Sequence, residues 1–112
     1  MIRVYGIKNC DTMKKAFALL DNRKVAYEFH DYKKGGVPPG KLAAWAKKVG
    51  WEKLANSRGL TWRKIPDSQK ASLDEAKALE LLEQNPSAIR RPIVEAGGRL
   101  LVGLDPAELE KL

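Results

Sequence analysis

The stretch MIRVYGIKNCDTMKKAFALL, residues 1–20, decides the fold because it places a cysteine between a short strand and a helix. Apolar and polar residues alternate up to Gly6, which predicts the strand. After Cys10, apolar residues recur every three or four positions, which predicts an amphipathic helix with one buried face. Asp11 or Thr12 is the expected N-cap of this helix, because their side-chain oxygens accept hydrogen bonds from first-turn amides.

The remainder of the chain predicts the rest of an α/β fold. Residues 25–30 alternate as in a second strand, so the opening is a β-α-β unit with two parallel strands. A Gly-Gly pair at 97–98 predicts a hairpin, and an Asp-Pro pair at 105–106 predicts the start of a last helix. This order is that of a thioredoxin-like fold with a mixed sheet. We therefore expect a single domain, residues 1–112, with an all-helical insertion at about 38–86.

Two amphipathic helices are expected within the insertion. Apolar residues between 42 and 49 predict the first, and the Ser72 to Glu75 pattern is that of a capping box at the start of the second. Residues 51–65 predict only short helical turns near 56–59. The expected buried face of the second helix consists of Leu73, Ala76, Leu79 and Leu82. The tryptophans expected to pack in the core are Trp45, Trp51 and Trp62.

Length and composition narrow the class of protein. The chain has 112 residues, 44% of them hydrophobic, and no apolar run approaches the ~18 residues that span a membrane. Its start lacks the basic and long apolar regions of a signal peptide, so we expect a cytoplasmic protein. The formal net charge is +7, but the basic residues are spread along the chain and are not interleaved with aromatics. We therefore expect neither nucleic acid nor a membrane as a direct partner.

Cys10 is the only cysteine, so the chain forms no internal disulfide. A lone cysteine is often a small buried apolar residue, and that alternative stays open. At a helix N-terminus, however, unpaired amides and the helix dipole stabilise a thiolate and lower the pKa of the cysteine. The amides of Asp11, Thr12 and Met13 are placed to hold that anion, and Lys8 adds positive potential nearby. We also expect the Thr12 hydroxyl to donate to the sulfur.

Met13 occupies the position at which a C-x-x-C motif would carry its second cysteine. A two-cysteine mechanism within one chain is therefore excluded. Any disulfide at Cys10 must join it to glutathione, another protein or a second copy of the chain, and an external thiol must resolve that disulfide.

The segment IRRPIV, residues 89–94, is the second group of candidate residues. Arg91 offers a planar, bidentate fork for a carboxylate, a phosphate or another oxyanion, although an exposed or ion-paired arginine is the plainer alternative. The Arg91–Pro92 peptide bond is either trans, as most such bonds are, or cis. The segment therefore predicts an anion-binding arginine at the start of the hairpin.

Cys10 after the first strand, together with Arg91 and Pro92 before the hairpin, resembles the arsenate reductase/Spx family of thioredoxin-like proteins, and in particular its YffB-like branch. The resemblance covers essentially the whole chain. It implies a catalytic cysteine at Cys10, an anion-binding arginine at Arg91 and a cis-proline at Pro92.

The chain departs from the glutaredoxin-linked arsenate reductases of that family around the oxyanion. Asn56 stands where the first of two further arginines is expected, with Arg58 two residues later, and no arginine stands at 101–103. Gly6 replaces the histidine that precedes the cysteine in those enzymes. Because each missing charge weakens oxyanion binding by about 1.5–3 kcal/mol, arsenate reduction is not the first expectation.

Together these features predict a glutathione-dependent thiol oxidoreductase that uses a single nucleophile and mixed-disulfide chemistry. Glutathione or another small thiol is the expected co-substrate, a disulfide-bearing protein is a further expected partner, and no bound cofactor is expected. The expected catalytic residues are Cys10 and Arg91. The residues expected to bind substrate or glutathione are Lys8, Asn9, Asp11, Thr12, Met13, Arg58 and Pro92.

Two alternatives stay open. One is an arsenate reductase with a weakened oxyanion site. The other is a non-enzymatic, Spx-like regulator that binds a partner, although Met13 removes the C-x-x-C redox switch that such regulators often use. No metal site is expected, because His30 has no acidic or cysteine partner at ligand spacing.

Overall fold

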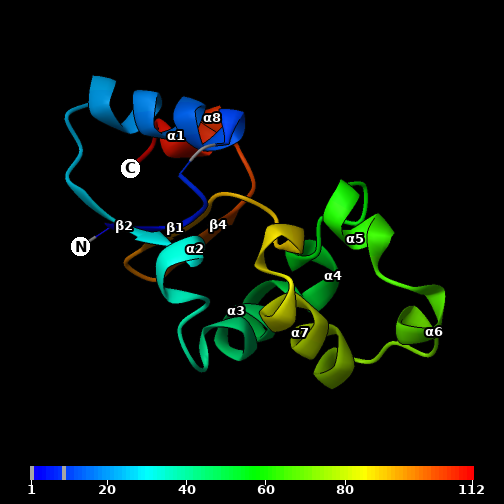
Figure 1. The fold of residues 1–112 in the computed structure, drawn as a ribbon. Coiled ribbons are helices and arrows are strands. Elements are labelled where there is room, and N and C mark those ends of the chain that lie inside the picture. The colour runs from blue at the N-terminus through cyan, green and yellow to red at the C-terminus, as the bar shows by residue number, and fades with distance from the viewer. Residues whose placement is uncertain (1, 9) are drawn as a thin grey trace. The chain divides into compact units, whose positions relative to one another are not determined.

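The computed structural model describes residues 2–8 and 10–112. The chain divides into two compact units (Figure 1). We call residues 1–35 together with 91–112 the sheet unit, and residues 36–90 the helical unit. The helical unit includes the whole segment that the sequence predicts as an insertion.

The sheet unit is built on a mixed sheet, as the alternating segments predict. Its strands are β1 (Ile2–Gly6), β2 (Tyr27–Asp31), β3 (Ile93–Ala96) and β4 (Arg99–Val102). They lie in the order β2-β1-β3-β4, with β1 parallel to β2, and with β3 antiparallel to both β1 and β4. The register pairs Gly6 with Asp31, so β1 and β2 end side by side. The predicted α/β fold with a mixed sheet is therefore confirmed.

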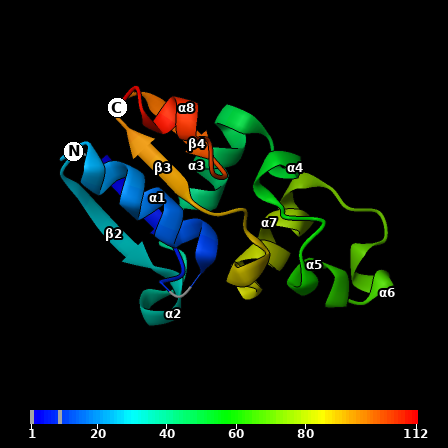
Figure 2. The same ribbon diagram turned by 90° about the horizontal axis from the view of Figure 1, so that it is seen from above.

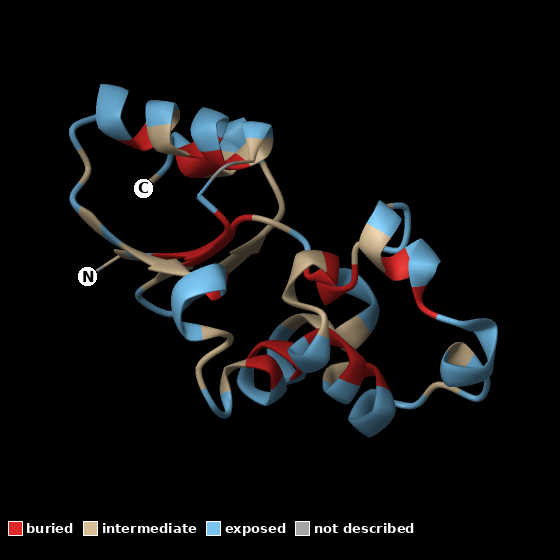
Figure 3. Cartoon of the chain, in the orientation of Figure 1, coloured by how far each residue is buried: buried red, intermediate tan, exposed pale blue. Residues whose placement is uncertain are grey.

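Helices α1 (Asp11–Asn22) and α8 (Pro106–Leu109) lie side by side on one face of this sheet (Figures 1 and 2). In Figure 3 the buried positions of α1 are on its sheet-facing side, and its outer positions are exposed. Each large side chain buried in this way contributes about 1.5–3 kcal/mol to folding. The core of the unit consists of Val4, Met13, Ala16, Leu20, Val94 and Leu109.

The sheet unit also contains a short helix that the sequence did not indicate, α2 (Tyr32–Gly35), directly after β2. The amide of Lys33 donates to Oδ1 of Asp31 at 2.9 Å, which ties the end of the strand to the start of this helix. Tyr32 is buried, whereas the other residues of α2 are exposed.

The helical unit contains helices and no strand among its described residues. Its helices are α3 (Lys41–Val49), α4 (Trp51–Leu54), α5 (Leu60–Lys64), α6 (Asp67–Lys70), α7 (Glu75–Gln84) and the 3-10 helix η1 (Pro86–Ala88). An isolated bridge between Ala55 and Ile89 joins the chain before α5 to the chain after η1. Trp45 and Trp62 are buried, as predicted, while Trp51 is only half-buried.

The N-cap predicted for α1, at Asp11 or Thr12, is wrong, because the helix begins earlier in the chain. Its N-cap is Cys10, and Asp11 is already the first helical residue, so neither Asp11 nor Thr12 caps the helix. The carboxylate of Asp11 instead lies in the first turn, where the helix dipole favours negative charge.

The capping box predicted at the start of α7 is wrong. The N-cap is Asp74, whose Oδ1 accepts a hydrogen bond of 2.8 Å from the Lys77 amide. Ser72 lies two residues earlier, with a left-handed φ of 55°, and is outside the helix. A carboxylate three residues before Lys77 is placed to cap its amide, whereas a serine at 72 is not.

The predicted buried face of α7 is wrong for the same reason. Of its four residues only Leu82 is buried; Leu73 and Leu79 are half-buried, and Ala76 is exposed. The buried residues of α7 are Ala78, Leu81 and Leu82.

Within the described part of the chain, no helix is both long and apolar enough to cross a membrane.

Candidate functional site

Cys10 is the N-cap of the longest helix in the sheet unit. Its backbone is extended, with φ −133° and ψ 132°, and its carbonyl accepts the Lys14 amide at 2.9 Å to begin α1. Its side chain is a free, half-buried thiol that packs at the margin of the core. The sequence therefore predicts its position between strand and helix correctly.

The surroundings of Cys10 lower the pKa of its thiol. Burial acts in the opposite direction and raises the pKa, but the Met13 and Thr12 amides, the Arg91 charge and the Thr12 hydroxyl together outweigh it. The Cys10 side chain makes no capping hydrogen bond, although the first-turn amides favour its ionised form. The arrangement favours a nucleophilic sulfur.

Met13 contributes its amide to the site and its side chain to the core. The side chain is fully buried, and a Cβ added at Gly6 would lie 2.5 Å from its Sδ and 2.7 Å from its Cε. The end of β1 and the first turn of α1 are therefore in close contact through these two residues. A side chain at position 6 therefore requires the end of the Met13 side chain to move.

Arg91 and Pro92 lie in the sheet unit, immediately before β3. The Arg91–Pro92 bond is cis, which answers the alternative that the sequence left open. Pro92 is buried, and its carbonyl accepts the Gly103 amide at 2.9 Å. Arg91 is half-buried, and its charge acts on the Cys10 sulfur, so these two predicted residues belong to one site.

Tyr32 is a neighbour of Arg91 that the sequence did not indicate. Burial raises the pKa of its phenol, while the charge of Arg91 acts to lower it. Among residues 2–8 and 10–112, nothing hydrogen-bonds to its buried hydroxyl. The single arginine thus acts on a thiol and on a phenol.

The remaining predicted residues are distributed over both units. Lys8 and Asp11 are exposed in the sheet unit, and Asn9 lies outside the described residues. Arg58 is exposed in the helical unit, in the turn between α4 and α5, and its role toward Cys10 stays a prediction. In the same turn Asn56 accepts the Gly59 amide on its carbonyl at 3.0 Å, so the position expected to carry an arginine shapes a tight turn instead.

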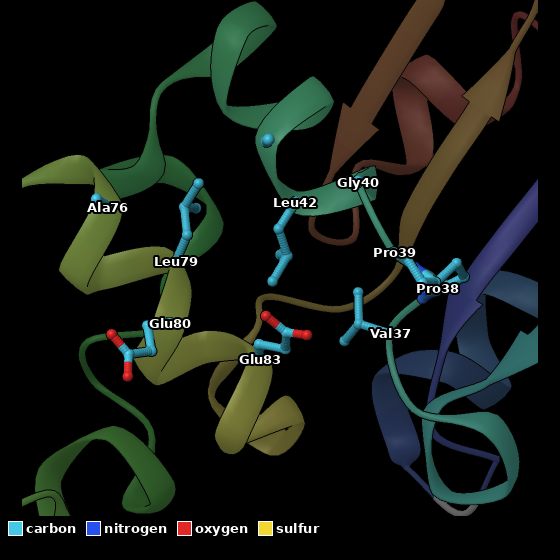
Figure 4. Close-up of a pocket in the computed structure, with 10 residues that line it drawn as sticks. Val37, Pro38, Pro39, Gly40, Leu42, Ala76, Leu79, Glu80 and Glu83 are labelled. Atoms are coloured by element: carbon cyan, nitrogen blue, oxygen red, sulfur yellow. The ribbon is translucent and has the colours of Figure 1, made fainter.

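Several hollows of the described residues are not lined by Cys10 or Arg91, and two of them lie in different units. One, of about 410 Å³ in the sheet unit, is lined by Lys8, Phe29, His30, Asp31, Lys34 and Gly35. The sequence indicated only Lys8 among them, although ligands often bind where parallel strands end, and β1 and β2 end together. The other, of about 240 Å³, belongs to the helical unit, where Val37, Leu42 and Glu83 converge on it (Figure 4).

A thiol at the start of the helix after the first strand, with a cis-proline before the hairpin, defines a thioredoxin-like α/β protein. The chain belongs to the ArsC family, whose family model matches residues 5–112. It is therefore an arsenate reductase-like member of the thioredoxin-like proteins.

Relatives in this family carry different names. A solved structure named YFFB protein is 52% identical, with a TM-score of 0.93 over 96% of this chain and 95% of that chain. A structure of an arsenate reductase (ArsC) related protein from Brucella melitensis is 45% identical, with a TM-score of 0.77 over 98% of this chain and 92% of that chain. The global transcriptional regulator Spx of Streptococcus agalactiae is 26% identical over 97% of this chain and 80% of its own length.

Proposed function

We propose that this protein is a glutathione-dependent thiol oxidoreductase in which Cys10 is the nucleophile. The observation that carries the proposal is the position of Cys10 as the N-cap of α1, where the Met13 and Thr12 amides and the Arg91 charge lower the pKa of its thiol. A larger thiolate fraction at neutral pH gives faster attack on disulfides.

The proposed reaction begins with a mixed disulfide between a substrate thiol and glutathione. The Cys10 thiolate attacks the glutathione sulfur, the S–S bond breaks, and the substrate sulfur leaves as a thiolate that takes a proton from solvent. A second glutathione, as its thiolate, then attacks the glutathione sulfur bound to Cys10. This step releases glutathione disulfide and restores the Cys10 thiolate, so one glutathione is consumed for each substrate thiol released.

The other residues of the site take binding roles in this proposal. Because Met13 replaces the second cysteine of a C-x-x-C motif, the mixed disulfide is resolved only by an external thiol. Arg91 binds a carboxylate of glutathione and stabilises the attacking sulfur. The peptide of the bound thiol lies along Pro92, and Asp11 provides a further contact.

Arsenate reduction is the alternative that family membership favours. It requires tight binding of a highly charged oxyanion, and the chain has Gly6 and Asn56 where a histidine and an arginine are expected. Arsenite formed from arsenate in the presence of glutathione, and absent with Cys10→Ser, is the result that supports this alternative.

The likeness to Spx regulators favours a non-enzymatic role in which Cys10 does no chemistry. That role predicts a slowly reacting thiol with an ordinary pKa. It also predicts a partner whose binding is the same for the wild-type protein and for Cys10→Ser.

The deciding experiment is a pH titration of Cys10 alkylation by iodoacetamide from about pH 4 to 10, followed by mass analysis after incubation with glutathione disulfide. We expect a midpoint below the roughly 8.5 of a free cysteine and a glutathione adduct at Cys10. Cys10→Ser is the blank for both measurements. A midpoint at or above that of free cysteine, with no adduct, contradicts the proposed function.

A further inference from the structure

The hollow at the carboxyl ends of β1 and β2 has no role in the proposed chemistry, although it begins two residues from Cys10. Lys8, from the loop between β1 and α1, lines one side of it, and Lys34 from α2 lines it as well. Its volume of about 410 Å³ is within the range of small-molecule sites. All of its lining residues belong to the sheet unit, as Cys10 does.

The polar groups of this hollow carry a net positive charge. Lys8 and Lys34 are exposed, and neither forms an ion pair with any residue in 2–8 or 10–112. Asp31 is the one acidic lining residue, and its Oδ1 already accepts the Lys33 amide. Two cations against one partly engaged carboxylate suit a monoanion better than a dianion such as phosphate.

Two lining residues of the hollow, Phe29 and His30, are adjacent in β2, so their side chains lie on opposite faces of the sheet. The ring of His30 lies 5.7 Å from that of Tyr5 and 6.2 Å from that of Tyr32, and Phe29 packs edge-on against Phe17 at 5.0 Å. A Cβ at Gly35 would lie 3.4 Å from Cε1 of His30, so the backbone of α2 closely approaches this ring. The lining of the hollow therefore combines the end of β2 and the start of α2 with two lysines.

The geometry points to this hollow as a carboxylate subsite that takes one of the two carboxylates of glutathione while its sulfur is at Cys10. This inference rests on the proposed function, because it assigns a second contact to the same co-substrate. It adds Lys34 to the residues that determine specificity for glutathione, and it assigns the same carboxylate to Lys8. A neutral small disulfide, which has no carboxylate, gains nothing from the subsite.

The test compares the rate at which Cys10 forms a mixed disulfide with glutathione disulfide and with hydroxyethyl disulfide. We expect Lys34→Gln to slow the reaction with glutathione disulfide about two- to fivefold, and the Lys8→Gln/Lys34→Gln pair to slow it further. The rate of the Lys34→Gln variant with hydroxyethyl disulfide stays unchanged. Salt at about 1 M removes most of the difference, because the lysines are exposed.

Lys33→Gln is the matched control, since Lys33 is exposed, adjacent in sequence and absent from the lining. Equal slowing of both disulfides by Lys34→Gln, or the same effect from Lys33→Gln, overturns the subsite. So does a normal rate of Lys34→Gln with glutathione disulfide. Failure of the wild-type protein to react with either disulfide refutes the proposed function itself, so the two failures are distinguishable.

Discussion

The N-caps of α7 and α1 differ in how they use the unpaired amides of the first helical turn. At α7 the Asp74 carboxylate accepts the Lys77 amide at 2.8 Å, so a first-turn amide is satisfied by a permanent cap. At α1 the N-cap is Cys10, whose thiol makes no capping hydrogen bond, although the Thr12 and Met13 amides lower its pKa. The first arrangement stabilises a helix, whereas the second leaves first-turn amides available for an anion that forms only when the thiol ionises.

Replacing the cap of α1 is expected to have the largest effect on the difference between the two helix starts. Cys10→Ser places a preferred N-cap at α1 but removes the nucleophile, so we expect intact helical structure and complete loss of the glutathione adduct. Circular dichroism and mass analysis after incubation with glutathione disulfide measure the two properties. Asp74→Ser, the same substitution at the N-cap of α7, keeps the adduct. Loss of helical content in Cys10→Ser would contradict this expectation, because a serine N-cap would then not replace the cysteine at the start of α1.

The close contact of Gly6 with Met13 is the next way to disturb the α1 start. Gly6→Ala places a methyl group against a fully buried thioether, and we expect a loss of about 1–3 kcal/mol in the free energy of unfolding. Because Met13 supplies the amide that most favours the thiolate, the alkylation midpoint of Cys10 should also rise. Urea unfolding and iodoacetamide titration measure these effects.

Gly98→Ala is the control for that prediction, because a Cβ at Gly98 meets nothing within 4 Å. Its free energy of unfolding should change by no more than about 0.5 kcal/mol. The double variant Gly6→Ala/Met13→Ala should be more stable than the sum of the single changes allows, since the added methyl fills part of the space that Met13 leaves. Strict additivity would show that the two side chains do not compete for one space.

The cap of α7 should contribute to stability alone. Asp74→Ala leaves the Lys77 amide without its acceptor, and we expect the free energy of unfolding to fall by about 1 kcal/mol. Asp74→Asn keeps an acceptor oxygen and should lose less. The alkylation midpoint of Cys10 should be the same in all three proteins. A shifted midpoint in Asp74→Ala contradicts the separation of the two roles.

Much of the fold follows from local patterns in the sequence. The alternation of β1 and β2, the Gly-Gly turn of the hairpin and the Asp-Pro start of α8 each depend on neighbouring residues, and each is found as predicted. Asp105 caps α8 by accepting the Glu108 amide at 3.2 Å. These features are predictable because turn and cap chemistry is decided within a few residues.

The errors arise where several residues in a row are able to cap. Asp11 and Thr12 follow Cys10, and Ser72 precedes Asp74, so the choice depends on which side of the helix must face the core. At α1 that choice places the fully buried Met13 inside, and the cysteine becomes the cap.

The sequence predicts which residues belong to the candidate site, but not how they are arranged in space. Cys10 and Arg91 were indicated by sequence position, but their electrostatic coupling depends on a sheet in which β1 lies next to β3. Lys34 was not indicated, because it reaches the hollow only through the short helix α2 and the pairing of β2 with β1.

Two substitutions around Cys10 separate the contributions to its lowered pKa. Arg91→Gln removes a charge that favours the thiolate, and Thr12→Val removes a hydroxyl that contributes less, so both raise the alkylation midpoint and Arg91→Gln raises it more. The backbone amides are retained in both variants, so each midpoint should stay below that of a free cysteine. Arg99→Gln, a change at an arginine paired with Glu108, is the control and should have no effect. A larger shift for Thr12→Val than for Arg91→Gln would reverse the order of these contributions.

The smallest expected effect is a pH dependence of stability that only the α1 start should show. Because the pKa of Cys10 is lower in the folded protein than in the unfolded chain, ionisation of the thiol favours the folded state. This contribution is complete above the unfolded value of about 8.5, decreases as the pH falls toward the folded value, and is absent below it. The free energy of unfolding of the wild-type protein, minus that of Cys10→Ser, should therefore rise with pH across this interval, and Arg91→Gln should narrow the interval. A difference that stays constant or falls with increasing pH would mean that the folded protein does not stabilise the thiolate, and the contrast with Asp74 would then be one of cap strength alone.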